Sequence, residues 1–482
     1  MSHLLDMKTL YKTVFKIINS YVIKDSNNPL ITKDMGQSVG TGFFIENGNG
    51  LALTAAHVIE NSTEIWINMP ETGEVNLKAK IISVYPDYDL AVIKVDIVND
   101  SFLDLGNSDS IKIGDDAYTI GYPNNPKYPI LTKGTISGMR DDYLQVDTPL
   151  NHGNSGGPLM CKGKVIGVNS AVIKDSENSS LIVPIDIYKN HKGRLYKEKI
   201  IYKCSHGLLL VKNNPAYRSY YNIDNNTASN ICNNGGVIIK HIYRNSPLKK
   251  TKSMLKSHIK TGDVICSISI DNNSYLIDMS GELSVKWNHG KIDIIRLINN
   301  YPPGKPITIN FWSISKKRLD KVTFNSSTLD KVYPIKMYFA PLTYPEFEIF
   351  AGLIIMSLNV DHIKSDLTGY LMNYIETSEI YKPRLLISHI YPNTYITEYS
   401  NFRVNNFLTR VNNKKVTTIK EFITFIKKPV IKNGIKYIIL ENSNSDTCMF
   451  KLKDILEQEE KLSVIYNYEK SSIYSYYKDL KS

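Results

Sequence analysis

Cysteine is scarce in this sequence, and it forms none of the closely spaced pairs that bind zinc. The 482 residues contain five cysteines, an odd number spread along the chain as Cys161, Cys204, Cys232, Cys266 and Cys448. Scattered cysteines without a C-x-x-C pair predict free thiols in a reducing compartment, and they argue against a structural zinc site. We therefore expect no bound metal.

Long uncharged hydrophobic runs are also missing. The apolar stretch within the first thirty residues is interrupted by charges at Asp6, Lys8, Lys12 and Lys16, so it lacks the uncharged core of a signal peptide. The first arginine is Arg140, whereas a mitochondrial transit peptide is rich in arginine. The most apolar later segment, 347–360, contains Glu348 and is shorter than the roughly 20 residues of a spanning helix. These absences predict a soluble, intracellular protein that does not cross a membrane.

The chain has no G-x-x-x-x-G-K-[ST] loop, the common motif that binds the phosphates of ATP. We therefore expect no cofactor. Its formal net charge is +11, but the lysines are dispersed and their densest groups are short. We interpret this charge as a solvated basic surface, and we expect no nucleic-acid partner.

What the sequence does contain is a succession of short β-type runs. Between about residues 10 and 190 these runs alternate with turn signals, which is typical of an all-β barrel or sandwich. A polar, Asn-rich stretch follows, and after it two segments each combine strands with short helices. We expect a mainly β protein with three domains, at 1–195, 196–330 and 331–482.

The segment "NHGNSGGPL", 151–159, places a serine among glycines. A nucleophilic serine requires a base for its proton and N–H donors for the developing negative charge. Glycine leaves room for the substrate and lets the backbone aim its amides. The segment therefore predicts Ser155 as a nucleophile, with the N–H groups of Gly153 and Ser155 as an oxyanion hole.

Two further residues complete a candidate triad. His57 ends the apolar strand "LTAAHV", and Asp89 opens the apolar strand of "PDYDLAVIKV", where a buried carboxylate needs a partner. Asp87 is the alternative carboxylate, although we expect it to face water, and His152 is an alternative base that we interpret as a loop residue. The chain order His57, Asp89, Ser155 is the one found on double β-barrels.

Residues 10 to 190 resemble the trypsin-like protease domain of the HtrA/Deg family. The similarity rests on "GTGFFIENGNGLALTAAHVI", "DYDLAVIKV", "GNSDSIKIGDDAYTIGYP", "TKGTISG" and "VDTPLNHGNSGGPLMCKGKVIGVNS". It implies a trypsin-like double β-barrel with His57 as general base, Asp89 as its orienting carboxylate and Ser155 as nucleophile.

The resemblance continues downstream. "GVIIKHIYRNSPL" and "HIKTGDVICSI" are similar to a PDZ domain of this family, and the third segment is similar to the divergent second PDZ domain of plant- and fungal-type Deg proteases. We therefore expect two PDZ-like α+β domains after the barrels. In "HGLLLV", Gly207 and Leu208, Leu209 and Leu210 are predicted to bind a peptide end, with an ordinary buried strand as the alternative.

The family's substrate pocket corresponds here to Leu181, Ile182 and Val183, which follow Ser180 where the family commonly has glycine. Because no acidic residue lies there, we expect cleavage after a small or medium aliphatic residue.

The resemblance implies an ATP-independent serine endopeptidase that cleaves unfolded or misfolded proteins and forms a homo-oligomer, a trimer or a multiple of trimers. The alternative is a weakly active or inactive scaffold or holding chaperone that binds unfolded proteins without cutting them. A nucleic-acid-binding role, suggested only by charge, would require binding that weakens strongly with salt.

Overall fold

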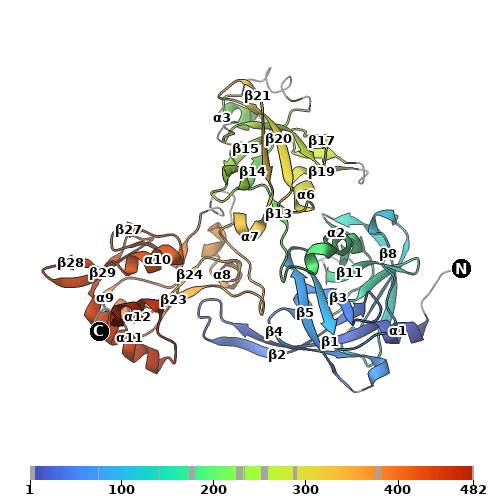
Figure 1. The fold of residues 1–482 in the computed structure, drawn as a ribbon, viewed down its shortest axis with the longest axis horizontal. Helices are drawn as coiled ribbons and strands as arrows, with labels where there is room; N and C mark the ends of the chain where they lie inside the picture. The colour runs from blue at the N-terminus through green and yellow to red at the C-terminus, as the bar shows by residue number, and fades with distance from the viewer. Residues whose placement is uncertain are drawn as a thin grey trace.

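The computed structural model describes residues 6–73, 75–140, 142–172, 180–223, 232, 234–250, 259–285, 290–374, 379 and 382–479. The chain folds into two β-barrels followed by two mixed α/β units (Figure 1). The barrels lie at the right of the figure, the first unit at the top and the second at the left. The expectation of a mainly β protein with a double barrel and two PDZ-like units is confirmed. The exact domain limits remain predictions.

Each barrel closes from six strands. The first has the order β1 (Val14–Lys24), β2 (Thr32–Phe44), β3 (Leu51–Ala55), β6 (Leu90–Val95), β5 (Leu77–Tyr85) and β4 (Ser62–Asn68). The second has the order β10 (Pro158–Cys161), β11 (Lys164–Val172), β12 (Ser180–Pro184), β9 (Tyr143–Val146), β8 (Ile130–Arg140) and β7 (Asp116–Gly121). Helices α1 (Met7–Thr13) and α2 (Ile185–Leu195) flank them.

The two barrels share a hydrophobic core. One cluster of buried side chains combines Leu53 and Val92 of the first barrel with Ile120 and Val168 of the second. Burying these aliphatic side chains stabilises the contact between the barrels, at roughly 25 cal/mol per Å² of apolar surface. The connections between strands at this contact are therefore held in fixed positions, which a site built from both barrels requires.

The first PDZ-like unit is a six-stranded sheet with the order β14 (Leu208–Val211), β15 (Val237–Ile242), β16 (Val264–Ile270), β20 (Pro306–Ser313) and β21 (Arg318–Asn325), with β17 (Asn273–Leu276) beside β16. In β20 buried and partly exposed residues alternate, as a sheet with one covered face requires. Small strand pairs are β13 (Cys204–Ser205) with β22 (Ser327–Thr328), and β18 (Glu282–Ser284) with β19 (Lys291–Asp293). The helices are α3 (Pro215–Tyr220), α6 (Ile294–Asn299) and α7 (Leu329–Val332).

The second PDZ-like unit has an eight-stranded sheet. Its order is β23 (Phe347–Phe350), β24 (Leu353–Ser357), β25 (Leu385–Ile390), β26 (Phe407–Val411), β29 (Ile435–Asn442) and β28 (Val430–Lys432), with β27 (Lys414–Lys415) and β30 (Thr447–Lys451) at the side. Its helices are α8 (Val360–Ser365), α9 (Tyr395–Tyr399), α10 (Ile419–Ile426), α11 (Leu452–Ile465) and α12 (Ser472–Asp479).

Both units contact the barrels. Arg296 of α6 lies 2.6 Å from the carboxylate of Asp142, which precedes β9. The long β1–β2 hairpin extends from the first barrel toward the second unit (Figure 1), where Ser26 Oγ lies 2.7 Å from Ser365 Oγ. The units are thus connected to the barrels by specific polar contacts as well as by the chain.

The prediction that all cysteines are free is wrong for two of them. Cys232 and Cys266 form a disulfide with a Cα–Cα distance of 4.9 Å, whereas Cys161, Cys204 and Cys448 are free and buried. The two partners are 34 residues apart in sequence, so their spacing gave no sign of pairing. The fold brings them together because the start of β15 lies beside β16, and both cysteines belong to one buried cluster with Ile238 and Val264.

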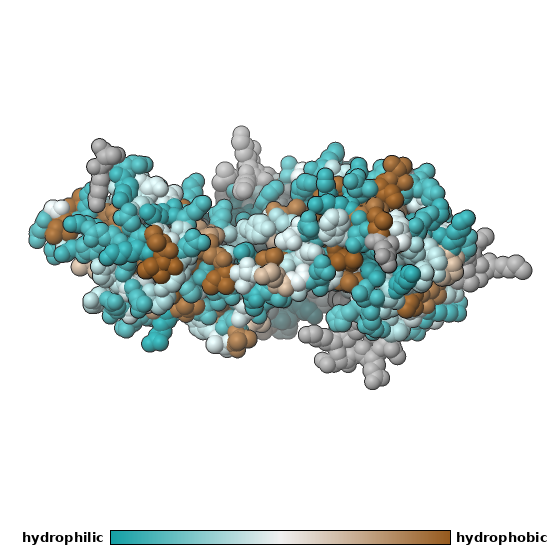
Figure 2. Space-filling view, turned by 90° about the horizontal axis from the view of Figure 1, so that it is seen from below, coloured by the Kyte–Doolittle hydropathy of each residue, from teal (hydrophilic) through white to brown (hydrophobic). Residues whose placement is uncertain are grey.

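No helix in the described ranges is long and apolar enough to cross a membrane. On the face seen in Figure 2, apolar residues form several separate patches within a mainly hydrophilic surface.

Candidate active site

His57 and Asp89 lie side by side at the edge of the first barrel. Asp89 Oδ2 is 2.8 Å from His57 Nδ1, and Asp89 Oδ1 accepts a hydrogen bond from the His57 backbone N–H at 2.8 Å. One carboxylate therefore fixes both the backbone and the ring of the same residue. Because Nδ1 faces Asp89, Nε2 is the ring nitrogen that is left to accept a proton.

Local backbone structure sets this geometry. His57 lies in a 3₁₀ helix, η1 (Ala56–Ile59), directly after β3. Asp89 has a left-handed conformation, with φ of 54°, between the 3₁₀ helix η3 (Pro86–Tyr88) and β6. Its carbonyl also accepts a hydrogen bond from Ala56 N–H at 3.1 Å. Aspartate tolerates this region of φ better than most residues, which suits it to a position that must turn its carboxylate back toward β3.

The alternative residues lie elsewhere. Asp87 does not simply face water, because its carboxylate accepts a hydrogen bond from the Lys203 backbone N–H at 2.8 Å and burial raises its pKa. The prediction that Asp87 faces water is therefore wrong. Asp87 instead holds the segment at Lys203, which follows the second barrel. His152 is exposed, and its ring forms no hydrogen bond with another residue in the described part of the chain.

Ser155 reaches the same place from the second barrel, through Ser170 of β11. The Ser155 hydroxyl donates to the Ser170 carbonyl oxygen at 3.3 Å, and the Ser170 hydroxyl donates to Asp89 Oδ2 at 2.5 Å. Ser170 thus connects Ser155 to Asp89, whose carboxylate also contacts His57. Among the described side chains, the Ser155 hydroxyl bonds to Ser170 O and has no hydrogen bond to His57.

The conformation of the loop before Ser155 depends on glycine and on contacts with β2. Gly153 has φ of +101°, and a Cβ there would lie 2.1 Å from the Tyr122 carbonyl oxygen, so no other residue fits. Thr41 of β2 anchors the loop, because its hydroxyl donates to Gly153 O at 2.6 Å and its N–H donates to Ser155 O at 2.8 Å. Within the described residues, the N–H groups of Gly153 and Ser155 donate to no other group, and their role as an oxyanion hole stays a prediction.

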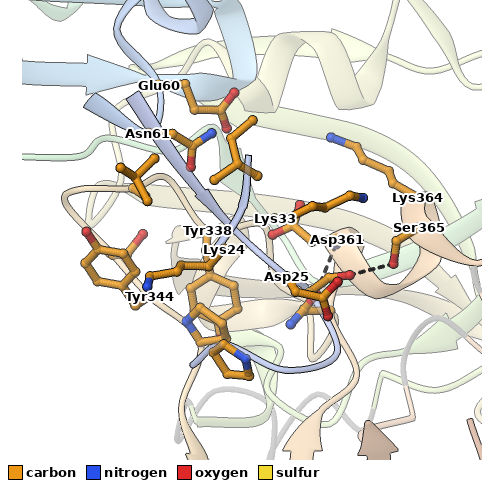
Figure 3. Close-up of a pocket in the computed structure, with 18 of the residues that line it drawn as sticks. Lys24, Asp25, Lys33, Glu60, Asn61, Tyr338, Tyr344, Asp361, Lys364 and Ser365 are labelled. Atoms are coloured by element: carbon orange, nitrogen blue, oxygen red, sulfur yellow. Dashed lines mark hydrogen bonds between the residues drawn. The ribbon is translucent and has the colours of Figure 1, made fainter. Parts of the chain in front are cut away.

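The pKa of His57 is raised. Burial of the ring acts to lower it, but the hydrogen bond to Asp89 and the negative charges of Asp89 and Glu60 outweigh burial. Glu60 follows η1 and lines a cavity of about 510 Å³ between the β1–β2 hairpin and the second PDZ-like unit, where Asp361 and Lys364 are its neighbours (Figure 3). Burial in turn raises the pKa of Glu60. The pKa of His57 therefore depends on the charge of Glu60, which lies between the first barrel and the second PDZ-like unit.

Parts of the chain are similar to known serine proteases. The family described as trypsin-like peptidase domain matches residues 40–168, a range that contains positions 57, 89 and 155. A probable periplasmic DegP-like serine endoprotease of Pseudomonas putida is 30% identical over 259 residues, which are 51% of this chain and 50% of that protein. The protein of the same description from Hahella chejuensis is 24% identical over 431 residues, 87% of this chain and 81% of its own length.

Among solved structures, the HtrA-type protease AlgW with a decapeptide has a TM-score of 0.50 and 21% sequence identity, and the match covers 66% of this chain and 97% of AlgW. This likeness concerns the fold. In sequence the chain is similar to HtrA/Deg serine endoproteases, and residues 40–168 match the trypsin-like peptidase domain. It spans about half the length of the first curated HtrA/Deg relatives that it matches.

The role of Leu181, Ile182 and Val183 as a substrate pocket remains a prediction. Ile182 and Val183 are fully buried and pack in the hydrophobic clusters of the barrels, whereas Leu181 is partly exposed. Only Leu181 of the three therefore has side-chain surface that a substrate can contact in this conformation.

The predicted peptide-binding residues form the start of β14. Gly207 has φ of +69°, Leu208 is buried in the core of the first unit, and Leu209 and Leu210 are partly buried. Their role in peptide binding is a prediction that the fold leaves open.

Sequence reasoning missed Ser170 and Thr41, which position the candidate nucleophile and its loop. Both are small hydroxyl residues within β-type runs, and their types alone give no sign of a role. What distinguishes them is the register of β11 and β2 against loops far away in sequence. Only the proximity of "VNS" to the glycine-rich loop hinted that Ser170 lies near the site.

Proposed function

We propose that this chain is an HtrA/Deg-type serine endopeptidase in which Ser155, His57 and Asp89 act as a catalytic triad. The observation that carries the proposal is the junction at Ser170, which contacts both Asp89 and Ser155 while Asp89 holds the ring of His57. The three groups come from separate segments of the two barrels, and hydrogen bonds through Ser170 and Asp89 connect these segments.

In the proposed reaction, Ser155 Oγ attacks the carbonyl carbon of a peptide bond and transfers its proton to His57 Nε2. Asp89 stabilises the imidazolium ion that forms. The carbonyl oxygen becomes negative and accepts hydrogen bonds from Gly153 N–H and Ser155 N–H, as transition-state stabilisation requires. His57 then gives the proton to the leaving amine, and a water molecule, activated by the same imidazole, hydrolyses the acyl-enzyme to release the carboxylate product.

The proposed substrates are unfolded or misfolded proteins, degraded without ATP. The sequence has no phosphate-binding loop that could drive unfolding, so substrates must arrive already extended. The aliphatic character of Leu181 supports cleavage after a small or medium apolar residue. From the family resemblance we also propose a homo-oligomer built from trimers, which light scattering after size-exclusion chromatography would measure.

One observation favours the second candidate, a scaffold or holding chaperone. The Ser155 hydroxyl is bonded to Ser170 O instead of His57, which describes a resting arrangement. A chain fixed in this arrangement would bind unfolded proteins and release them uncut.

The test compares the full chain with Ser155→Ala on an unfolded, reduced and alkylated protein, with fragments identified by mass spectrometry. The proposal expects fragments from the unsubstituted chain only. Binding without fragments from both proteins would favour the holding chaperone, and equal fragments from both would remove Ser155 from the mechanism.

A further inference from the structure

The cavity of about 510 Å³ beside Glu60 lies where separate parts of the fold meet. The β1–β2 hairpin, the chain after η1, the segment 338–347 and α8 all contribute to its lining (Figure 3). None of the three candidate catalytic residues is among the residues that line it. Ligand sites commonly have volumes of about 300–1,000 Å³, lie between domains and combine an apolar wall with a few charged groups. The cavity has these properties.

Two carboxylates face the cavity from different domains. Glu60 follows η1 of the first barrel, and Asp361 lies in the first turn of α8 (Figure 3). Burial raises the pKa of both carboxyl groups, and the negative charge of Asp361 raises the pKa of Glu60 further. Partly buried groups of like charge are stabilised by a positive charge placed between them.

The lysines of the lining do not supply this positive charge at contact distance. Lys364 acts on Glu60 and Asp361 and lowers the pKa of each, but its side chain is exposed. Lys33 is exposed as well. Within the described residues, neither of the two carboxylates accepts a hydrogen bond or forms an ion pair within 4 Å. Both therefore have acceptor sites available to a ligand.

Two other charged side chains of the lining are already bonded. Lys24 Nζ donates to Thr32 Oγ1 at 3.3 Å. Asp25 Oδ1 accepts hydrogen bonds from the backbone N–H groups of Asn27 and Asn28, at 2.9 and 2.8 Å. These contacts hold the tip of the hairpin in its own conformation, so we assign no role in ligand binding to either residue.

Aromatic side chains form part of the wall near the carboxylates. Tyr338 is partly buried, and burial together with the charges of Glu346 and Asp361 raises its pKa, which places the ring close to Asp361. Phe347 is also partly buried, whereas Tyr344 is 60% exposed at the side of the cavity. An aromatic face attracts a cation, and an apolar wall accepts the carbon chain that carries it.

We propose that this cavity binds an organic cation, a primary ammonium or guanidinium group on an apolar stem, with its charge between Glu60 and Asp361. Such a group donates hydrogen bonds to both carboxylates at once, and its stem packs against Tyr338 and Phe347. The ligand would connect the first barrel to α8 of the second PDZ-like unit. Two sources have this chemistry, a free polyamine and a basic side chain of a polypeptide.

Binding should be measured by isothermal titration calorimetry on the full chain carrying Ser155→Ala, so that the result does not depend on the proposed peptidase activity. The probes are butylguanidinium and butylurea, which have nearly the same shape but differ in charge. We expect butylguanidinium to bind with a Kd of about 1 mM or lower, and butylurea to bind at least about tenfold more weakly. Equal binding of the two probes, or no binding of butylguanidinium, would overturn the proposal.

Substitutions locate the site. Glu60→Gln and Asp361→Asn each remove one negative charge from the cavity, and each should weaken butylguanidinium binding by about tenfold. The matched control is Glu346→Gln, because Glu346 is exposed in the same segment as Tyr338 and does not line the cavity. This control should leave the Kd within about twofold of the parent value. Equal weakening in all three variants would show that only the general charge of the surface matters, and would overturn the proposal. If Glu60→Gln does not fold, Asp361→Asn gives the same test from the other domain.

Competition identifies the source of the cation. Spermidine and a tripeptide of alanine, arginine and alanine with blocked ends are each added to the complex with butylguanidinium. Displacement at lower concentration by spermidine would support a free polyamine, and displacement at lower concentration by the tripeptide would support a basic side chain. Failure of both to displace the probe would contradict the assigned ligand chemistry.

The bound cation should also act on the candidate base. Glu60 is one of the negative charges that raise the pKa of His57, so a cation beside Glu60 should lower that pKa. Nuclear magnetic resonance can follow the ring of His57 in the Ser155→Ala chain, with its signal identified by its absence after His57→Ala. Butylguanidinium should shift the titration to lower pH, and the shift should be lost in Glu60→Gln. An unchanged titration in the parent chain would contradict the placement of the cation beside Glu60.

Discussion

The hydroxyl of Tyr88 lies 2.7 Å from Oδ1 of Asn300, so that the residue directly before Asp89 contacts the end of α6 in the first PDZ-like unit. The same hydroxyl is 3.0 Å from Asp142 Oδ2, and Arg296 of α6 contacts the other oxygen of that carboxylate. Tyr88 is fully buried, and Lys203 lies over its ring at 3.9 Å from the centroid. The position of Asp89 is thereby linked to the unit that carries β14.

Asn300→Ala tests this link. A hydrogen bond of this kind contributes about 0.5–1.5 kcal/mol, and if that energy helps to hold Asp89 in place, peptidase activity should fall by up to about tenfold. Thermal unfolding should change little, because the buried ring of Tyr88 remains. Asn299→Ala, on the same helix, is the control and should leave activity near that of the unsubstituted chain. Equal losses in the two variants would show that Tyr88 does not transmit the contact.

The raised pKa of His57 should set the pH at which kcat/KM falls on the acidic side of its pH profile. His57 must be neutral to accept a proton, so kcat/KM should fall as the pH drops through a value above 6.5. Glu60→Gln removes one of the charges that raise this pKa, and it should move the acidic limb to lower pH. A profile measured on a fluorogenic peptide would show the shift, and an unmoved limb in Glu60→Gln would exclude the coupling between Glu60 and His57.

Asp89→Asn removes the carboxylate that orients His57 and raises its pKa. Substitution of the corresponding carboxylate in a serine triad lowers kcat by about 10⁴, and we expect a loss of this order here. Asp87→Asn is the matched comparison, because Asp87 accepts a hydrogen bond from Lys203 N–H in the linker and the substitution should reduce activity far less. A comparable loss in Asp87→Asn would mean that the orienting carboxylate has been misassigned.

Burial raises the pKa of Glu459 to about 7, which makes stability depend on pH. The folded state retains this proton between pH 4.5 and 7 while the unfolded state releases it, so the free energy of unfolding should decrease as pH rises through this window. The full effect is roughly 3 kcal/mol. Glu459→Gln carries no titrating proton and should flatten the dependence, as measured by urea unfolding at several pH values.

The neighbouring substitution Glu460→Gln provides the comparison for Glu459. Glu460 is exposed and contacts Lys470 and Lys478, so its removal should leave the slope between pH 4.5 and 7 unchanged. A flat profile in the unsubstituted chain would contradict the assignment of Glu459 as a buried, protonated acid near neutral pH.

The disulfide predicts a definite thiol count. Denatured but unreduced protein should be alkylated at Cys161, Cys204 and Cys448 only, and at all five cysteines after reduction. Closing a loop of 34 residues is worth roughly 3–4 kcal/mol in the chain-entropy account, so reduction should lower the unfolding midpoint of the first unit. Mass spectrometry that finds five alkylated thiols without reduction would exclude the bond.

Much of the protein could be predicted from local sequence. Alternating burial within strands such as β20, the glycine-rich loop around Ser155 and the strand ends at His57 and Asp89 depend on short stretches, and the double barrel followed from their order. The contacts of Ser170 with Asp89, of Cys232 with Cys266 and of Glu459 with Ala351 depend on register between distant segments. A short stretch of sequence does not indicate how distant segments align. These contacts therefore could not be predicted before the structure was known.

The central claim is that Ser155 is a nucleophile activated by His57. Its most direct test is covalent labelling with a fluorophosphonate, which reacts with activated serine hydroxyls and adds a defined mass. The account predicts a single adduct on the peptide that contains Ser155, absent in Ser155→Ala and formed at least about 10³-fold more slowly in His57→Ala. Labelling of another serine, or an unchanged rate at Ser155 in His57→Ala, would contradict it.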